Sequence, residues 1–312
     1  MSKIYDSIIV GGGPAGITAA VYALRAGLKV LLIERQVIGG QIFITDSLKN
    51  YPGFTEISGA DFSTKLIEQA ESLGLEIIYD TAVEFKLSAE VKEIVTGGSG
   101  TYFGKTVILS MGASAKGLNL PNEQNYIGKG ISYCATCDGA FFKDKTVAVV
   151  GGGNSAVQDV LYLSKIAKKV YHIHRMSPFR ADEENLAALR ALVAKKGSNV
   201  EQVLSVNVLG LVGSKKLEGI KVQALGCKTE TLAVDGVFVA IGREPQTNAI
   251  SAQINLNKQG YIAADQRMHT NIAGVFAAGD VVDKSLRQVV TAASDGAIAA
   301  TEASSYLRST KK

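Results

Sequence analysis

The residues with the most distinctive chemistry lie in the stretch Cys134-Ala135-Thr136-Cys137-Asp138-Gly139. Two thiols at this spacing can close a disulfide or remain an open dithiol, and the adjacent carboxyl of Asp138 can exchange protons with them. The same spacing also forms half of many zinc sites, which need four ligands. The remaining chain offers only Cys227 and three scattered histidines. We therefore expect a dithiol used for electron transfer, no metal, and Cys227 as a packed or surface residue.

A dinucleotide-binding fingerprint stands close to the start of the chain. Residues 5–10 predict a short buried strand, and the glycine-rich turn at 11–16 opens a helix. Residues 28–33 predict a second strand that ends at Glu34. The spaced glycines allow a tight turn, a close backbone approach to a pyrophosphate, and close packing of helix on strand. The helix N-terminus then faces the phosphates, while an acid at the strand end can accept hydrogen bonds from ribose hydroxyls.

The same strand-turn-helix-strand pattern occurs a second time. Residues 146–150 predict a strand, the turn at 151–156 opens a helix, and a strand at 170–173 leads to Arg175, with Arg180 close behind. An acid at this position repels a 2′-phosphate, whereas an arginine pairs with it. The first copy therefore suits FAD or NAD, and the second suits NADP(H).

The segments between and after these copies predict short strands and core-facing helices. Residues 59–73 show helical spacing, residues 75–110 predict a β-meander, and residues 201–241 return to short strands. A strand at 274–277 then runs into a glycine-acid corner, where Asp280 can hold a ribityl or ribose hydroxyl. A helix rich in small residues follows and can pack closely against its neighbours.

Composition limits the classes of protein to which the chain can belong. The length of 312 residues favours two domains, and a hydrophobic share of 46% is enough to build a core in each. No apolar run reaches the length of a membrane span, and there is no room for a leader before the first strand. Three cysteines suit a reducing cytoplasm. A net charge of +4 without a dense basic run favours anionic ligands or an acidic protein partner, with no nucleic acid.

Taken together and in this order, the motifs resemble the low-molecular-weight bacterial thioredoxin reductases, of the class II pyridine nucleotide-disulfide oxidoreductases, from end to end. The segments that carry the resemblance are 11–16, 39–41, 134–139, 151–156, 174–175, 179–181, 277–280 and 287–288. The resemblance implies an α/β fold with two Rossmann-like dinucleotide-binding domains, each a three-layer ββα arrangement. An NAD(P)H-binding domain at 115–244, which carries the cysteine pair, would be inserted into an FAD-binding domain split between 1–114 and 245–312. Hinges are expected at 114–117 and 242–245.

The resemblance also assigns cofactor contacts. Those expected for FAD are Gly11, Gly13, Pro14, Ala15, Gly16, Glu34, Arg35, Gly39, Gly40, Gln41, Asn50, Val83, Gly112, Asp280, Arg287, Gln288 and Val289. Those expected for NADPH are Gly153, Asn154, Ser155, Arg175, Arg180 and Arg243. Many family members have a second arginine where this chain has Met176. Losing one charge-assisted hydrogen bond would weaken the NADPH preference by about tenfold to a hundredfold.

The resemblance implies an NADPH-dependent thioredoxin-disulfide reductase that works as a homodimer. Electrons would pass from NADPH to FAD, then to the Cys134–Cys137 disulfide, then to oxidised thioredoxin, with rotation of one domain against the other between steps. Cys137 would be the sulfur nearer the flavin, Cys134 would attack the partner, and Asp138 would be the acid-base group.

Four alternative functions remain to be weighed. The same core could take electrons from NADH or reduced ferredoxin, or could be a flavin-dithiol redox sensor. The flavoprotein of alkyl hydroperoxide reduction carries an extra N-terminal region, while this chain starts at the first FAD strand. The related ferredoxin-NADP reductases lack the cysteine pair, so the presence of the pair in this chain argues against that function.

Overall fold

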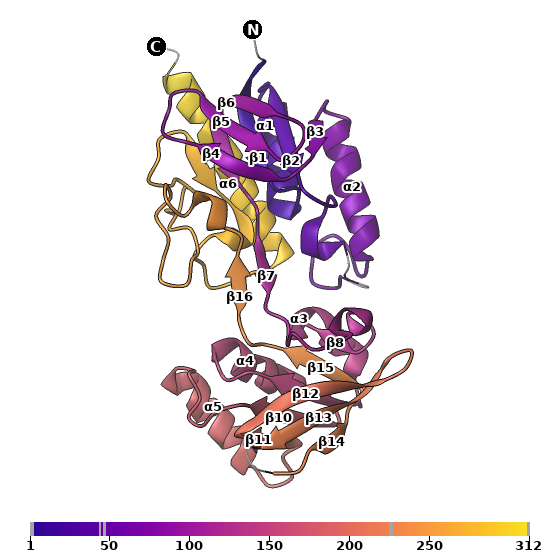
Figure 1. Ribbon diagram of the computed structural model, residues 1–312. Helices are drawn as coiled ribbons and strands as arrows, with labels where there is room; N and C mark the ends of the chain where they lie inside the picture. Colours follow the sequence, from indigo (N-terminus) through magenta and orange to yellow (C-terminus); the bar gives the residue numbers. More distant parts are fainter. Residues whose placement is uncertain (1–2, 44, 46–47, 225–226, 311–312) are drawn as a thin grey trace. The chain divides into compact units, whose positions relative to one another are not determined.

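The computed structural model describes residues 3–43, 45, 48–224 and 227–310. The chain divides into two compact units (Figure 1). The first unit comprises Met1–Ser114 and Glu244–Lys312, and the second comprises Ala115–Arg243. The second unit is therefore inserted into the first, and its end differs by one residue from the boundary expected from the sequence.

The first unit is built on a mixed sheet with the strand order β3-β2-β1-β6-β5-β4, in which β17 pairs with β6. Its elements are β1 (Ile4–Val10), α1 (Pro14–Arg25), β2 (Val30–Glu34), η1 (Gly40–Ile42), α2 (Gly59–Glu71), β3 (Glu76–Tyr79), β4 (Ala82–Lys86), β5 (Lys92–Thr96), β6 (Thr101–Leu109), η4 (Asn248–Ile250), β17 (Val275–Ala277), η5 (Gly279–Val281) and α6 (Val289–Ser309). The start of β6 pairs antiparallel with β5, and its end pairs parallel with β17. The sheet thus separates into a parallel part and a β-meander that lies over it.

Two cores enclose the parallel part of this sheet. On one face, Ile9 and Leu32 pack against α1 and α6. On the other face, Ile8 and Leu31 pack against the meander, which contributes Phe85 among others. Alternation along β1 and β2 thus places side chains on both faces, and the unit has three layers of the ββα type.

The second unit repeats this arrangement. Its elements are η2 (Glu123–Tyr126), β8 (Ile131–Ser132), α3 (Ala135–Asp138), η3 (Gly139–Phe142), β9 (Thr146–Val150), α4 (Asn154–Leu163), β10 (Lys169–His174), α5 (Glu183–Ala194), β11 (Val200–Leu204), β12 (Val206–Gly213), β13 (Leu217–Ala224), β14 (Glu230–Ala233) and β15 (Gly236–Val239). A parallel sheet with the order β11-β10-β9-β15-β8 has the antiparallel sheet β12-β13-β14 on one side and helices on the other. The expected α/β fold with two Rossmann-like sheets is confirmed.

Two short strands join the units. β7 (Ala113–Ala115) pairs with β16 (Arg243–Pro245), and just beyond them the N–H of Lys116 donates to the carbonyl of Gly242 at 3.0 Å. The chain therefore enters and leaves the second unit side by side, at the two segments expected to be hinges.

The β-meander expected over residues 75–110 is correct only in part. β3 does not belong to it, because this strand pairs parallel with β2. Alternation of apolar and polar residues predicts a strand but cannot identify its partner, which explains the difference.

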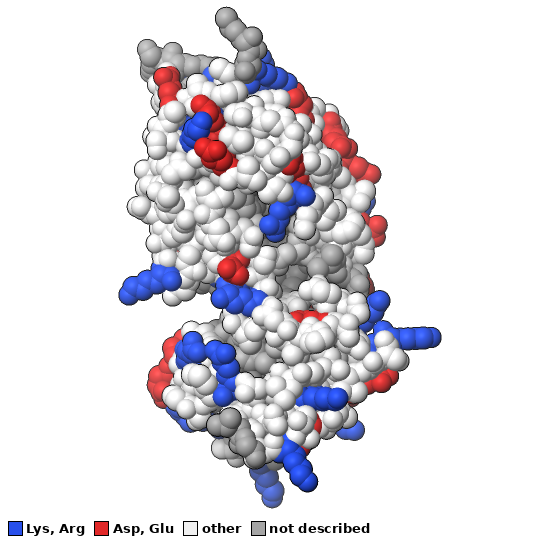
Figure 2. Space-filling model, in the orientation of Figure 1, with Lys and Arg blue, Asp and Glu red and all other residues white. Residues whose placement is uncertain are grey.

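No helix in the described part of the chain is long and apolar enough to cross a bilayer. On the face shown in Figure 2, basic and acidic side chains occur singly or in small groups on both units.

Candidate redox and nucleotide-binding sites

Cys134 and Cys137 form a disulfide at the start of α3, with their Cα atoms 5.3 Å apart. Cys134 is the extended N-cap residue of this helix, and its carbonyl accepts hydrogen bonds from the N–H groups of Cys137 at 3.2 Å and Asp138 at 3.1 Å. Ala135, between the two cysteines, is buried and packs into the core beside α4. The helical turn therefore holds both sulfurs at bonding distance on a fixed support.

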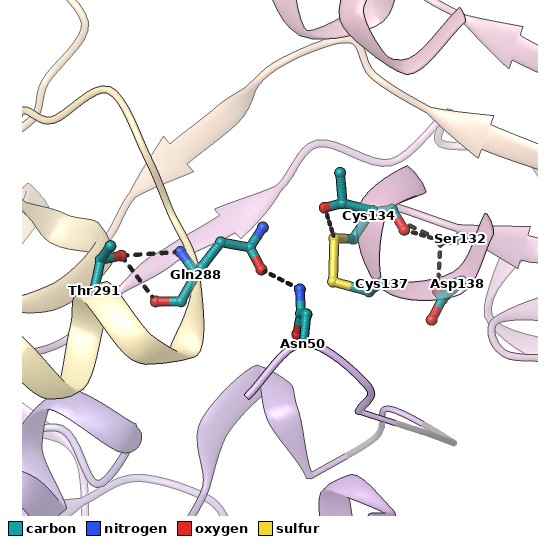
Figure 3. The surroundings of a disulfide bond; sticks show 8 residues. Asn50, Ser132, Cys134, Cys137, Asp138, Gln288 and Thr291 are labelled. Carbon is teal, nitrogen blue, oxygen red and sulfur yellow. Dashed lines mark hydrogen bonds between the residues drawn. A yellow bond between two sulfur atoms is a disulfide. The ribbon is translucent and has the colours of Figure 1, made fainter. Parts of the chain in front are cut away.

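Asp138 ends the same short helix, and Ser132 at the end of β8 connects it to Cys134 (Figure 3). The Ser132 hydroxyl lies 2.6 Å from Oδ2 of Asp138, and it accepts a hydrogen bond from the Cys134 N–H at 3.1 Å. The structure thus brings the three residues predicted to be catalytic into one cluster, together with a serine that the sequence reasoning missed.

A buried carboxyl, that of Glu123, supports the residue before Cys134. Oε1 of Glu123 accepts hydrogen bonds from the hydroxyl of Tyr133 at 2.9 Å and from the N–H of Leu118 at 2.8 Å. Burial, reinforced by the Glu123 carboxylate, holds the pKa of Tyr133 well above its usual value, so the phenol stays neutral and donates. Glu123 thereby connects the segment that enters the second unit to the residue that directly precedes the dithiol.

The first glycine-rich turn has the shape that a pyrophosphate requires. A Cβ on Gly11 would lie 2.4 Å from the carbonyl oxygen of Ser110, and one on Gly16 would lie 1.9 Å from the carbonyl oxygen of Gly11. Gly11 also has φ +104°, which favours glycine. At Gly13, the N-cap of α1, a Cβ would meet nothing within 4 Å. The turn is therefore tightly packed on its inner side and open at the helix N-terminus, where phosphate oxygens can approach the backbone.

Glu34 closes this turn. The carboxyl is buried, and it accepts hydrogen bonds from the N–H groups of Gly12 at 2.6 Å and Gln36 at 2.8 Å, one on each oxygen. Each carboxylate oxygen has a second lone pair, so ribose hydroxyls can still donate to Glu34. The Glu34 carboxylate thus lies at the end of the first turn and keeps the capacity to accept hydrogen bonds from a ligand.

Several other residues expected to contact FAD lie together in the first unit. The Asn50 side chain donates to Oε1 of Gln288 at 3.0 Å, and Gln288 caps the N-terminus of α6 in a capping box with Thr291 (Figure 3). The Gln41 side chain donates to the carbonyl of Ala113. The Asn50 and Gln288 side chains are therefore fixed at the start of α6, and the Gln41 side chain is held against the segment that leaves the first unit.

The glycine-acid corner after β17 contains a charge cluster. The N–H of Gly279 donates to Oδ2 of Asp295 at 3.0 Å, and the Lys284 ammonium lies 2.7 Å from the same oxygen. Lys284 is also 3.8 Å from Oδ1 of Asp280. One largely buried cation is thus shared between two carboxylates, which fixes the corner that carries Asp280.

The remaining expected FAD contacts occupy different environments. The Arg287 guanidinium lies over the Tyr261 ring, 4.0 Å from its centroid, and donates to the carbonyl of Val282 at 3.2 Å. The Val289 side chain is buried in a small apolar cluster, which leaves its backbone N–H at the start of α6 as the group that can face a ligand. Val83 is half-exposed on β4. Pro14 and Ala15 are the first two residues of α1. The Arg35 guanidinium donates to the side chain of Gln246 at 3.3 Å. Three glycines expected to contact FAD have positive φ: Gly39, Gly40 and Gly112.

The second glycine-rich turn follows the first closely. A Cβ on Gly151 would lie 2.3 Å from the carbonyl oxygen of Ala240, and one on Gly153 would meet nothing within 4 Å. The N–H of Gly151 donates to the Ile173 carbonyl at 3.0 Å, as that of Gly11 does to the Ile33 carbonyl at 2.9 Å. The two turns therefore share the same backbone bonding and the same open position at the helix N-terminus.

The group that closes the second turn is a histidine. The His174 ring is buried against Gly152, where a Cβ would lie 2.3 Å from the ring, and it stacks on Phe179. Burial, together with the charges of Arg180 and Arg175, lowers the pKa of His174, so its ring is neutral near pH 7. Both arginines therefore lie near the histidine, in the segment that follows β10.

The other residues expected to contact NADPH surround the start of α4. Oδ1 of Asn154 accepts a hydrogen bond from the N–H of Asp182 at 2.8 Å, and Ser155 is exposed in the first turn of the helix. Arg243 lies on β16, and its charge acts on Asp159 of α4. Cys227 is exposed and has no disulfide partner among the described residues, where no group of three or more His, Cys, Asp or Glu side chains is placed to bind a metal.

Comparison with known proteins identifies the family. The model described as pyridine nucleotide-disulphide oxidoreductase matches residues 5–296. The chain is 42% identical over 310 residues to a thioredoxin reductase of Bacillus subtilis, covering 98% of this chain and 95% of that protein. The crystal structure of thioredoxin reductase from Streptococcus pyogenes matches with a TM-score of 0.91 and 37% identity, covering 99% of this chain and all of that one. A ferredoxin-flavin thioredoxin reductase from Clostridium acetobutylicum matches with a TM-score of 0.54 and 29% identity, covering 99% and 100%. The chain belongs to the pyridine nucleotide-disulphide oxidoreductase family and, within it, to the thioredoxin reductases.

Proposed function

We propose that the protein is an NADPH-dependent thioredoxin-disulfide reductase, with FAD bound by the first unit and NADPH by the second. The observation that carries this proposal is a pair of glycine-rich turns with matching backbone structure but different side chains packed against them, one acidic and one neutral. The same chain holds a disulfide at the start of a helix. Glu34 closes the first turn and His174 the second. The relatives named above support thioredoxin as the protein that is reduced.

FAD fits the first unit for two reasons. The glycine-rich turn of this unit leaves room for the FAD pyrophosphate, and polar side chains are available to bind the ribose and the ribityl chain. Gly13 and the N-terminus of α1 would face the phosphates, Glu34 would accept from ribose hydroxyls, and Asp280 would accept from the ribityl chain. When bound, the flavin would supply a two-electron carrier between a nicotinamide and the disulfide.

NADPH fits the second unit for a similar reason. Gly153 leaves the N-terminus of α4 open to a pyrophosphate, and Arg175 and Arg180 offer two guanidinium groups to a 2′-phosphate. His174 is neutral and brings no negative charge to repel this phosphate. Met176 is 41% exposed and offers no charge there, so the two arginines alone would provide the preference for NADPH over NADH.

The cysteine pair would reduce thioredoxin by disulfide exchange. The Cys134 thiolate attacks one sulfur of the partner disulfide, which breaks that bond and forms a disulfide between the two proteins. The sulfur released from the partner leaves as a thiolate and takes up a proton, which Asp138 would supply. Cys137 then passes its proton to the Asp138 carboxylate and attacks the Cys134 sulfur. This step breaks the bond between the two proteins, reforms the internal disulfide, and releases the second partner sulfur as a thiolate that takes up this proton. Two electrons and two protons thus reach the partner.

Single substitutions test the cysteine pair. Cys134→Ser and Cys137→Ser, each checked for its flavin spectrum, should abolish NADPH-dependent thioredoxin reduction, while Cys227→Ser serves as a matched control. Full activity in either of the first two variants would refute the proposal. Repeated turnover also excludes a redox sensor, which would be reduced only once per molecule.

The electron donor needs its own experiment. Initial rates with NADPH, NADH and reduced ferredoxin should show NADPH to be preferred, and Arg175→Ala should reduce the NADPH rate at low concentration without changing the NADH rate. Equal NADPH rates in wild type and variant would remove Arg175 from the phosphate site. A higher rate with reduced ferredoxin than with NADPH would refute NADPH as the donor. It would favour ferredoxin, for which the Clostridium acetobutylicum relative is named.

The family resemblance further supports a homodimer located in the cytoplasm. Light scattering of the purified protein tests the dimer, since a monomer at micromolar concentration would contradict it. Fractionation of the native host tests the location.

A further inference from the structure

We infer that Ser132 is a positioning residue for the acid-base group Asp138, holding its carboxyl in place in both protonation states by rotation of the serine hydroxyl. This inference rests on the proposed function, in which Asp138 supplies the proton for disulfide exchange. It adds a residue outside the Cys134–Asp138 motif, at the end of a different element, β8.

The geometry around Ser132 gives its hydroxyl one strong acceptor and one weaker one. Ser132 is 5% exposed, and its Oγ lies 2.6 Å from Oδ2 of Asp138 but 3.3 Å from the carbonyl oxygen of Cys134. A hydroxyl has a single proton, and a separation near 2.6 Å is typical of a hydroxyl that donates to a carboxylate. The Cys134 N–H donates to the same Oγ at 3.1 Å. With Asp138 ionised, a continuous chain of hydrogen bonds therefore runs from the Cys134 backbone through Ser132 to the carboxylate (Figure 3).

The same groups, Oδ2 of Asp138, Oγ of Ser132 and the carbonyl oxygen of Cys134, can also form hydrogen bonds when Asp138 is protonated. A neutral carboxyl becomes a donor, and its O–H can then point at Oγ of Ser132, which has two lone pairs. The serine proton turns to the carbonyl of Cys134, already 3.3 Å away, while the Cys134 N–H keeps its acceptor. No proton leaves Ser132 in this exchange. The carboxyl can therefore take up and release its proton without losing its hydrogen-bonded position beside the cysteines.

Titratable groups near α3 come from several elements of the second unit. The elements packed most extensively against α3 are η3, which has no titratable side chain, and α4, which carries Asp159 and Tyr162. Tyr133 of the preceding segment donates to Glu123. The Ser132 contact is distinctive because it joins Asp138 to the backbone of the cysteine that is proposed to attack thioredoxin.

The test compares Ser132→Ala with Ser132→Thr, which keeps the hydroxyl. Ser164→Ala is the matched control, because that hydroxyl donates to the Leu161 carbonyl at 2.9 Å, at the end of α4. For each variant, kcat for thioredoxin reduction and the alkylation rate of the reduced thiols are measured across pH. Because an ionised carboxyl loses a charge-assisted hydrogen bond in Ser132→Ala, the alkaline limb of kcat should move up by about one pH unit, and kcat should fall about tenfold. KM for NADPH should not change, and Ser132→Thr should restore the wild-type profile.

Several outcomes would overturn the inference while leaving the proposed function intact. One is a wild type that reduces thioredoxin together with a Ser132→Ala variant in which the dependence of kcat on pH is unchanged. Another is a loss of rate in Ser132→Ala that Ser132→Thr does not restore, which would indicate a purely structural role. Asp138→Asn should remove the alkaline limb, and adding Ser132→Ala to it should cost little more. An additive loss would contradict a role through Asp138. Absence of thioredoxin reduction by the wild type would refute the proposed function itself.

Discussion

Asp159 should make the stability of the protein depend on pH in the opposite direction from an ordinary ion-paired acid. Burial in α4 raises its pKa from 3.8 to about 7, although the nearby charge of Arg243 acts in the other direction. A carboxyl whose pKa is higher in the folded protein than in the unfolded chain favours folding when protonated. Its contribution is complete below about pH 4 and is lost as the pH rises through about 7. A shift of about 3 units corresponds to a change of about 4 kcal/mol in the free energy of unfolding, as an upper limit.

Asp159→Asn removes the titrating group with little change in shape. Urea unfolding followed by circular dichroism, at intervals from about pH 4.5 to pH 8.5, gives the transition midpoint of wild type and variant. The variant should gain stability relative to wild type steadily from about pH 4.5 to pH 7, with little further change above about pH 8. Glu230→Gln, which removes an exposed carboxylate on β14, controls for net charge. A constant difference between Asp159→Asn and wild type across this range would refute the reasoning.

Three further substitutions test the first unit. In Gly296→Ala the new Cβ would lie 2.1 Å from the Ala15 carbonyl oxygen, so α6 must move from α1, and thermal unfolding should show a loss of about 1–3 kcal/mol. Asp295→Asn breaks a largely buried ion pair with Lys284 and should lower the free energy of unfolding of the flavin-free protein by about 3 kcal/mol; a change under about 0.5 kcal/mol would show that the pair is not structural. Glu34→Gln replaces one of the two carboxylate oxygens that accept hydrogen bonds with an amide N–H. Titration of the flavin-free protein with FAD should therefore show an affinity for FAD reduced at least about tenfold. An unchanged affinity would remove Glu34 from the site.

The glycine-rich turns could be predicted because their function requires backbone geometry that only a few residues permit. Gly11 and Gly151 both have positive φ, and a Cβ on either would collide with a backbone carbonyl of the strand end beside it. Such constraints act on the residue itself and leave a direct trace in the sequence. The spacing of the cysteines is visible for the same reason, since one helical turn fixes the separation of their Cα atoms.

The supporting residues could not be predicted, because their partners are set by packing between separate elements. Ser132 and Glu123 are ordinary polar residues in the sequence, and only the positions of β8, η2 and α3 show what they bind. Lys284 stands four residues after Asp280, but the segment between them is not a continuous helix, so this spacing alone does not predict an ion pair. Its shorter contact is with Asp295 in α6. Buried polar groups of this kind are found only once the fold shows which of them need a partner.

The two turns differ most in the side chain that closes each of them, and this difference bears on which nucleotide each would accept. Glu34 reaches the N–H of Gly12 and places a carboxylate at the end of β2, where a 2′-phosphate would meet a like charge. His174, at the end of β10, fills the equivalent space over Gly152 with a ring whose lowered pKa keeps it neutral. Because the backbone is otherwise matched, the proposed selectivity between the units would rest on these two side chains and the arginines beside His174. His174→Glu should therefore weaken NADPH binding far more than NADH binding in a competition titration. An equal loss for both nucleotides would show that His174 only fills space.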